Sequence, residues 1–133
     1  IYAVNTSTVS ATAANCSNAG NAGIYAVNTS TVSADGANCS NAGNAGIYVD
    51  FGSTIGADGA NCSNAGNIGI YAGASSTVSA FQAIIQNQTT GTARVIVAYG
   101  SHIEAAEIIT TGGTVTVFNQ AVNTLTANGI IYQ

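Results

Sequence analysis

Charged side chains are nearly absent from this 133-residue chain, which has a single arginine, Arg94, no lysine and five acidic residues. Without a basic patch, binding to nucleic acid or to anionic lipid lacks its electrostatic driving force. No apolar run approaches the ~20 residues that a membrane-spanning helix needs. We therefore expect neither nucleic-acid binding nor membrane insertion. A surface hydrated by Asn, Ser and Thr is common in secreted fibrous proteins and favours an extracellular location.

Methionine is also absent, leucine occurs once, at Leu125, and the apolar residues show no helical periodicity. The chain begins at Ile1, so we expect it to be a piece of a longer protein or a processed product. The lack of leucine and of a helical pattern excludes leucine-rich, ankyrin and tetratricopeptide repeats. Glycine does not recur at every third residue, which excludes collagen, and the repeat is short for a four-stranded propeller blade.

A repeat of 23 residues fills the first half of the chain. The sequence IYAVNTSTVSATAANCSNAGNAG at 1–23 returns with few changes at 24–46 and 47–69, and shorter remnants follow from Ile70 and Val95. Units of this length stack because none of them can bury its apolar face alone. Within each unit, two runs alternate apolar and polar residues, as strands with one inward face do. The pattern predicts an all-β parallel β-helix with 23-residue coils.

The segment GIYAVNTSTVSADGANCSNAGNAGIY resembles the repeats that follow the pectate-lyase-like β-helix in phage and prophage tailspike or tail-fibre proteins. The ending NTLTANGIIYQ at 123–133 resembles the C-terminus of such proteins. The resemblance covers essentially the whole chain. It implies a right-handed coil, a parallel homotrimer, a place in the virion tail, and attachment of the parent spike to bacterial surface polysaccharide. Parent spikes of this kind often degrade that polysaccharide.

The 23-residue register disappears after Ala105, so we expect coils over 1–105 and a capping segment over 106–133. A solenoid must cover its open end, because unpaired backbone groups and a bare apolar core would template aggregation. Gly112-Gly113 between two alternating runs predicts a hairpin turn. The tailspike resemblance implies that this tail also joins three chains. The residues expected to cap and trimerise are Ile108, Val115, Val117, Phe118, Leu125, Ile130 and Ile131.

Tyr2, Tyr25, Tyr48 and Tyr71 each follow an inward isoleucine, so strand alternation directs them outward, and the fifth coil places Ile96 at this position. An exposed apolar stripe along a solenoid usually marks a binding or assembly surface. Aromatic rings stack on sugar faces, and they also pack against neighbouring subunits. The replacement by Ile96 favours subunit contact over sugar binding.

Asp35 and Asp58 occupy the same turn position in successive coils, which would place two carboxylates within ~5 Å of each other along the axis. Paired carboxylates at short separation are what a retaining glycosidase requires, so a polysaccharide depolymerase is an alternative function. Aspartate in Ala-Asp-Gly is also favoured for its side-chain hydrogen bond to the turn backbone. The turn interpretation is the stronger of the two, because sugar chemistry also needs a shaped groove.

Metal and cofactor sites are not indicated. Cys16, Cys39 and Cys62 fall on one column, and an odd number on in-register parallel strands favours buried free thiols over disulfides. Their spacing matches no CxxC zinc site. His102 has no second ligand, and the calcium-binding nonapeptide GGxGxDxUx is absent. We therefore expect no metal and no cofactor.

Threonine triplets offer a further alternative. Thr6-Ser7-Thr8 and Thr29-Ser30-Thr31 resemble the threonine arrays of insect ice-binding solenoids, although the outer column lapses in the third and fourth coils. Threonine is also a good strand former with a wettable surface, which is the simpler explanation. The sequence therefore predicts, first, a structural, trimer-forming distal part of a tail spike or fibre. A polysaccharide depolymerase and an ice-binding solenoid are the alternatives. Four threonines persist in successive coils: Thr8, Thr31, Thr54 and Thr77.

Overall fold

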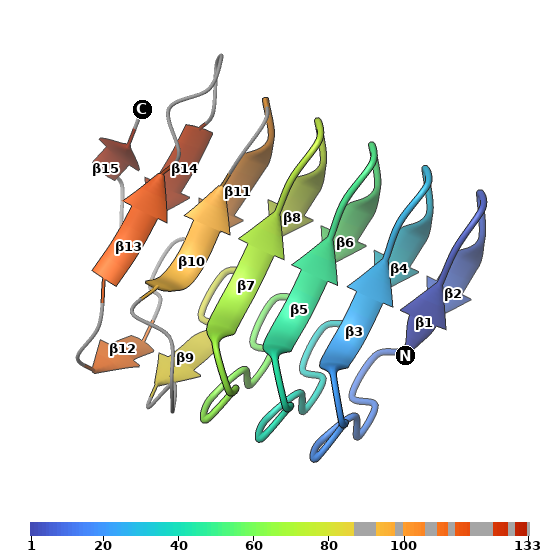
Figure 1. Cartoon of the computed structure of the whole chain (residues 1–133), viewed down its shortest axis with the longest axis horizontal. Coiled ribbons are helices and arrows are strands. Elements are labelled where there is room, and N and C mark those ends of the chain that lie inside the picture. Colours follow the sequence, from blue (N-terminus) through green and yellow to red (C-terminus); the bar gives the residue numbers. More distant parts are fainter. Residues whose placement is uncertain are drawn as a thin grey trace.

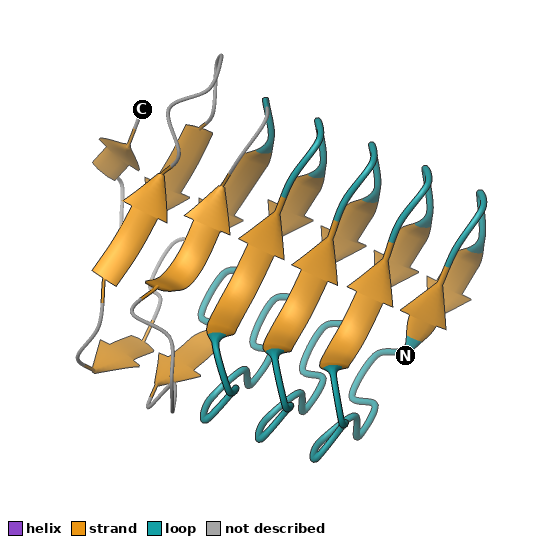
Figure 2. Cartoon of the chain, viewed as in Figure 1, coloured by secondary structure: helices purple, strands orange, loops and turns teal. Residues whose placement is uncertain are grey.

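The computed structural model describes the backbone at residues 1–86, 93–97, 100–105, 109–111, 114–117, 124–127 and 130–132, and side chains at 1–85 and 100–103. The regular structure of these residues consists of strands. No helix occurs among them, and accordingly none that is long and apolar enough to cross a membrane. The strands form rows along one axis, joined by turns and loops within each coil (Figure 2).

Equivalent strands of successive coils lie side by side (Figure 1). In spatial order, the first sheet contains β1 (Tyr2–Ala3), β3 (Ala22–Ala26), β5 (Ala45–Val49), β7 (Ile68–Ala72), β10 (Ala93–Val97) and β13 (Thr114–Val117). The second contains β15 (Ile130–Tyr132), β14 (Thr124–Ala127), β11 (His102–Ala105), β8 (Thr77–Ser79), β6 (Thr54–Gly56), β4 (Thr31–Ser33) and β2 (Thr8–Ser10). A third sheet pairs β12 (Ile109–Thr111) with β9 (Ile84–Gln86).

Chemically matching residues pair directly across the coils, as the repeat predicts. Strand β3 pairs in parallel with β5 so that Ile24 lies opposite Ile47, and β4 pairs with β6 so that Val32 lies opposite Ile55. On the remaining side of the coil, Asn15, Asn38 and Asn61 form isolated parallel bridges. The prediction of an all-β solenoid with parallel sheets and stacked coils of about 23 residues is confirmed.

The core is a narrow column of isoleucine, valine, alanine and cysteine. Ile24, Ile47 and Ile70 are fully buried, and each contributes roughly 1.5–3 kcal/mol through the apolar surface that it removes from water. Small residues close the corners of the coil. At Gly46, for example, an added Cβ atom would lie 2.6 Å from the Cβ atom of Cys62. This corner therefore admits only glycine without a shift of its neighbours.

A turn of two left-handed residues joins the first sheet to the second in each of the first four coils. Asn28 has φ of 57° and Thr29 has φ of 59°, and the other coils repeat these values closely. A buried serine follows the turn. The backbone N–H of Ser30 donates to the hydroxyl of Ser53 at 3.1 Å, and the N–H of Ser53 donates to that of Ser76 at 3.3 Å. This serine column satisfies backbone donors where the strands have ended.

Parallel stacking continues beyond Ala105. Strands β12, β13 and β14 pair in parallel with β9, β10 and β11, respectively. The hairpin predicted at Gly112-Gly113 is wrong, because β12 and β13 belong to different sheets and do not pair with each other. The two alternating runs are successive sides of one more coil. The parallel order changes at β15, which pairs antiparallel with β14 and places Tyr132 opposite Leu125.

Candidate functional site: the tyrosine column

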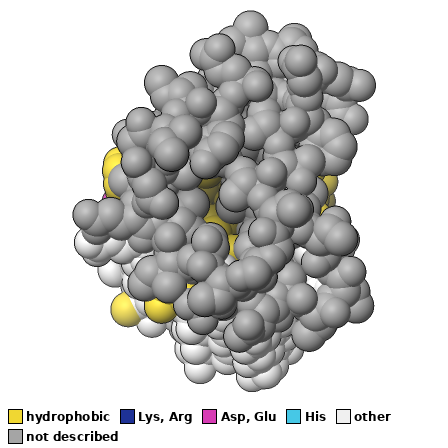
Figure 3. Space-filling view, turned by 90° about the vertical axis from the view of Figure 1, so that its left-hand side faces the viewer, with side chains coloured by type: hydrophobic (Ala, Val, Ile, Leu, Met, Phe, Trp, Pro, Cys, Tyr) yellow, Lys and Arg dark blue, Asp and Glu magenta, His cyan; other side chains and the backbone are white. Residues whose placement is uncertain are grey.

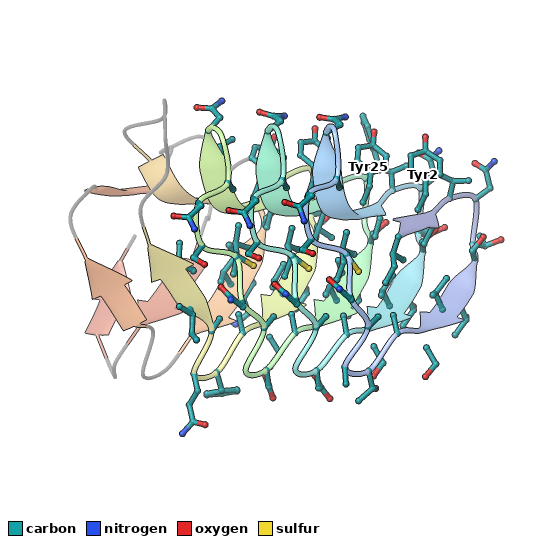
Figure 4. The ribbon with its side chains drawn as sticks, turned by 90° about the horizontal axis from the view of Figure 1, so that it is seen from below. Tyr2 and Tyr25 are labelled. Carbon is teal, nitrogen blue, oxygen red and sulfur yellow. The ribbon has the colours of Figure 1, made fainter. Side chains whose placement is uncertain are left out.

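Four tyrosine rings form a continuous stack on the outer face of the first sheet. The ring centroids of Tyr2 and Tyr25 are 4.8 Å apart, those of Tyr25 and Tyr48 are 5.0 Å apart, and those of Tyr48 and Tyr71 are 4.6 Å apart. Neighbouring ring planes differ by 6° to 12°. Figure 4 shows Tyr2 and Tyr25 lying one after the other along the axis. The in-register pairing of β1, β3, β5 and β7 produces this stack directly.

Stacking covers most of the ring faces. Tyr2 ends the stack and is 70% exposed, whereas the other three tyrosines are partly buried. A cavity of about 230 Å³ beside Tyr2 is lined also by Ile1, Asn21 and Tyr25. A sugar stacks on a ring face, so the column offers one open platform, while ring edges are available for packing along its length. This geometry favours subunit contact over sugar stacking, and the contact itself stays a prediction.

The backbone continues the column into the fifth coil, where Ile96 of β10 pairs with Tyr71 of β7. The side chain of Ile96 lies outside the described residues. On its other side, Ile96 pairs with Thr116 of β13. The ring stack therefore belongs to the first four coils, and the column beyond them has a different chemical character.

A buried carboxylate lies beside the tyrosine column. Asp50 is 8% exposed, and its Oδ2 atom accepts a hydrogen bond from the Tyr48 hydroxyl at 3.1 Å. Its Oδ1 atom accepts the backbone N–H of Phe51 at 3.0 Å. Burial raises the pKa of Tyr48 well above its ordinary value, and the adjacent negative charge of Asp50 raises it further. Tyr48 consequently remains a neutral hydrogen-bond donor to Asp50.

Sequence reasoning assigned no role to Asp50, because no neighbouring coil has an acid at this position. The available signal was the break in the repeat, since Val27 occupies the equivalent place in the second coil. In the fourth coil the position is Gly73, where an added Cβ atom would lie 2.5 Å from the Tyr71 hydroxyl oxygen and 2.9 Å from Oδ1 of Asp50. The carboxylate of Asp50 thus lies close to Gly73 as well as to its own turn.

Asp35 and Asp58 bind the backbone of the next coil. The Oδ1 atom of Asp35 accepts the N–H of Asp58 at 3.2 Å. The Oδ1 atom of Asp58 accepts the N–H of Phe81 at 3.0 Å and the hydroxyl of Ser79 at 2.8 Å. These bonds show both carboxylates stabilising turns, which is the stronger of the two interpretations of the sequence. The structure brings the two aspartates into adjacent coils.

Cys16, Cys39 and Cys62 are free and buried, and their sulfur atoms form a row inside the coil (Figure 4). The hydrogen bond with the Cys39 thiol and complete burial both raise the pKa of Cys62 well above its ordinary value. A neutral thiol in such a place acts as a small apolar side chain. Within the part of the chain that the structure describes, no group of three His, Cys, Asp or Glu residues is arranged to hold a metal ion.

The second sheet presents an exposed threonine column to solvent, formed by Thr8, Thr31, Thr54 and Thr77. Thr6 and Thr29 belong instead to the left-handed turns, so the sequence triplets do not lie on single strands. The residues two positions after the column are mostly serines, with Gly56 interrupting the series. His102 of β11 continues the threonine column and is partly buried.

The capping prediction falls mainly outside the described side chains. Ile108 and Phe118 lie outside the described residues altogether. For the other five, the structure describes the backbone alone. Val115 and Val117 lie in β13, Leu125 in β14, and Ile130 and Ile131 in β15.

The coil geometry, the stacked tyrosines and the hydroxyl-rich outer faces together define the class of this protein, a β-solenoid with a nearly uncharged surface. In Figure 3, the described atoms in view are mainly the white of polar side chains and backbone, with scattered hydrophobic atoms in yellow. No protein-family profile, curated protein or solved structure matches this chain.

Proposed function

We propose that this chain is a structural, trimer-forming segment of an extracellular phage tail spike or tail fibre. In this role it is a rigid rod that helps the parent protein to attach to bacterial surface polysaccharide. One observation carries the proposal: residues bond or pack to their equivalents one coil away in several columns that run along the solenoid. Tyr25, Ser53 and Ile47 each take part in such a column.

Two kinds of contact between the coils make the rod stiff. The apolar core resists separation of the coils, because any gap would remove dispersion contacts and admit water. The turn bonds of Asp35 and Asp58 and the serine column fix the corners of successive coils to each other. Because the second coil nearly copies the first, coils are interchangeable units of length, as a fibre requires.

A deletion of 24–46 tests the rod directly. Removing this unit joins Gly23 to Ile47 and restores the repeat, so the shortened chain should fold with an unchanged circular dichroism spectrum per residue. Its long dimension in small-angle X-ray scattering should decrease by about 4.8 Å per coil removed. A control deletion of 35–51 removes 17 residues instead of a whole 23-residue coil, so it shifts the following strands out of register and should not fold. A rod of unchanged length after the first deletion would refute the coil assignment.

Sedimentation of the full chain tests the trimer. The expected species is a trimer, and loss of 106–133 should leave monomers or aggregates. The tyrosine edges and the C-terminal segment are both expected to contribute contacts, so Tyr25→Ser and Tyr48→Ser together should also weaken assembly. A monomeric full chain, or a soluble trimer without 106–133, contradicts this part of the proposal.

Ice binding is a second candidate, favoured by the exposed, in-register threonine column on the second sheet. Methyl and hydroxyl groups repeat there at the strand spacing of about 4.8 Å, a regular array of the kind that a crystal surface presents. Thermal hysteresis of the purified chain is the measurement. The effect should be lost in Thr31→Lys and Thr54→Lys and retained in Thr12→Lys, where the exposed threonine lies in a loop. Absence of hysteresis in the unmodified chain excludes this candidate.

A further inference from the structure

The third coil departs from the repeat most strongly at one corner. Val27-Asn28-Thr29 of the second coil becomes Asp50-Phe51-Gly52. This turn imposes a left-handed backbone, with φ of 57° at Asn28 and 52° at Phe51. Asparagine tolerates that conformation, whereas a bulky residue such as phenylalanine is a genuine outlier there. The first two coils carry one disfavoured residue in this turn, the β-branched Thr6 or Thr29, and in the third coil the disfavoured residue is Phe51.

The Phe51 ring is also unprotected by the fold. It is 59% exposed, and Tyr2 is the only other large hydrophobic residue with a comparably exposed side chain among those described. Exposure and left-handed strain are two independent costs at one position. Residues held in such backbone conformations cluster at ligand-binding sites, and at Phe51 the strained residue also presents an exposed apolar ring.

Asp50 fixes the position from which the ring projects. Its buried carboxylate accepts the N–H of Phe51 at 3.0 Å and the hydroxyl of Tyr48 at 3.1 Å. The turn is bonded to both neighbouring coils as well: the Phe51 carbonyl accepts the N–H of Thr29 at 2.9 Å, and the N–H of Gly52 donates to the Ala74 carbonyl at 2.8 Å. A ring held by such a turn loses little freedom when a ligand covers it.

The surroundings of Phe51 restrict the ligand. A second chain packed along the rod would require a continuous apolar stripe on this face. The equivalents of Phe51 one coil away are Asn28 and Ala74, so no such stripe forms here. The apolar contact is thus one ring wide. Exposed Asn28, Thr29 and Ser75 supply an amide and two hydroxyl groups on the neighbouring turns. With one arginine in the whole chain and a net charge of −4, an anionic ligand would find no favourable field.

We infer that the Phe51 corner is a binding site for a neutral glycan, with one sugar face stacked on the Phe51 ring and its hydroxyls bonded to Asn28, Thr29 and Ser75. The apolar ring and the flanking uncharged polar groups are the combination that a neutral sugar ring complements. The inference specifies neutral glycans as the ligand class for the polysaccharide attachment proposed above, and it rests on that part of the proposal. The rod itself does not depend on it.

Native affinity electrophoresis tests the site with dextran, amylopectin or galactomannan cast in the gel, and with polygalacturonate as the anionic comparison. The matched variant is Phe51→Asn, which installs the residue of the first two coils and should fold at least as well. Phe51→Tyr retains the ring. We expect at least one neutral polysaccharide to retard the unmodified chain and Phe51→Tyr, and binding by Phe51→Asn to weaken about tenfold or more. Polygalacturonate should retard none of them.

Three results overturn this inference: no retardation by any neutral polysaccharide, equal retardation of Phe51→Asn, or stronger retardation by polygalacturonate. Sedimentation of the same proteins tests the other possible partner of the Phe51 ring, a second subunit of this chain. If Phe51→Asn changes the oligomeric state, the ring belongs to a subunit contact and the glycan site is wrong. If sedimentation and rod length stay unchanged while glycan binding fails, the structural proposal survives and the glycan site does not.

Discussion

Substitution of Gly46 by alanine gives the sharpest test of how tightly the coil is closed. The added Cβ atom would lie 2.6 Å from Cβ and 3.0 Å from Sγ of Cys62, and 2.8 Å from the carbonyl oxygen of Gly69. Ordinary contacts between carbon atoms are about 3.5–4.0 Å, so roughly 1 Å of movement is required. Cys62 is fully buried and Gly69 contributes backbone of β7, so neither can retreat without disturbing a neighbouring coil.

Overpacking of a closed core usually costs about 1–3 kcal/mol, and the rigid partners here place Gly46→Ala at about 3 kcal/mol. For a chain of this size that loss lowers the midpoint of thermal unfolding by on the order of 10 °C. Urea unfolding followed by circular dichroism measures the change. The control is Gly20→Ala, where the added atom would meet nothing within 4 Å. Equal stability of the two variants would refute the close packing of this corner.

Three further predictions concern single columns. Ser53→Ala removes the acceptor of the buried Ser30 N–H and should cost about 1–3 kcal/mol in urea unfolding, whereas Ser33→Ala at an exposed strand position should change little. The raised pKa of Tyr48 means that the unfolded chain ionises first as pH rises above about 10, so stability should fall there, and less steeply in Tyr48→Phe. Phe51→Asn should raise stability by roughly 1 kcal/mol, because asparagine relieves left-handed strain; an unchanged or lower unfolding midpoint would contradict that strain.

Repetition made the fold predictable from the sequence. Once Ile24 aligned with Ile47, and Tyr25 with Tyr48, parallel in-register pairing was the arrangement that buried each isoleucine against its copy. Strand alternation then placed the tyrosines outside. The same reasoning failed at Gly112-Gly113, because the local pattern of a hairpin and the corner of a solenoid coil use the same small residues. Only the pairing of β12 with β9 distinguishes them.

The site was less predictable, because its features depend on geometry within one turn. Alternation indicated that Tyr48 points outward, but it gave no sign that stacking covers the ring faces. The buried serine column was likewise missed, since Ser30 and Ser53 look like ordinary polar residues in the sequence. Their burial follows from the left-handed turn before them, whose φ values no composition rule reveals.

In a repeat protein, the recurring residues are those that folding of the coil requires. A departure from the repeat can therefore indicate a role other than folding. Positions 50–52 break it in three consecutive residues, and the consequences are chemically linked. The acid at Asp50 is satisfied by Tyr48 and by the Phe51 turn, and Gly52 takes the second left-handed position at φ of 69° without strain. Two of the three changes thus support the turn that presents Phe51. A random loss of the repeat would not be expected to supply both supports at once, which is why we place the proposed glycan site at this corner of the third coil.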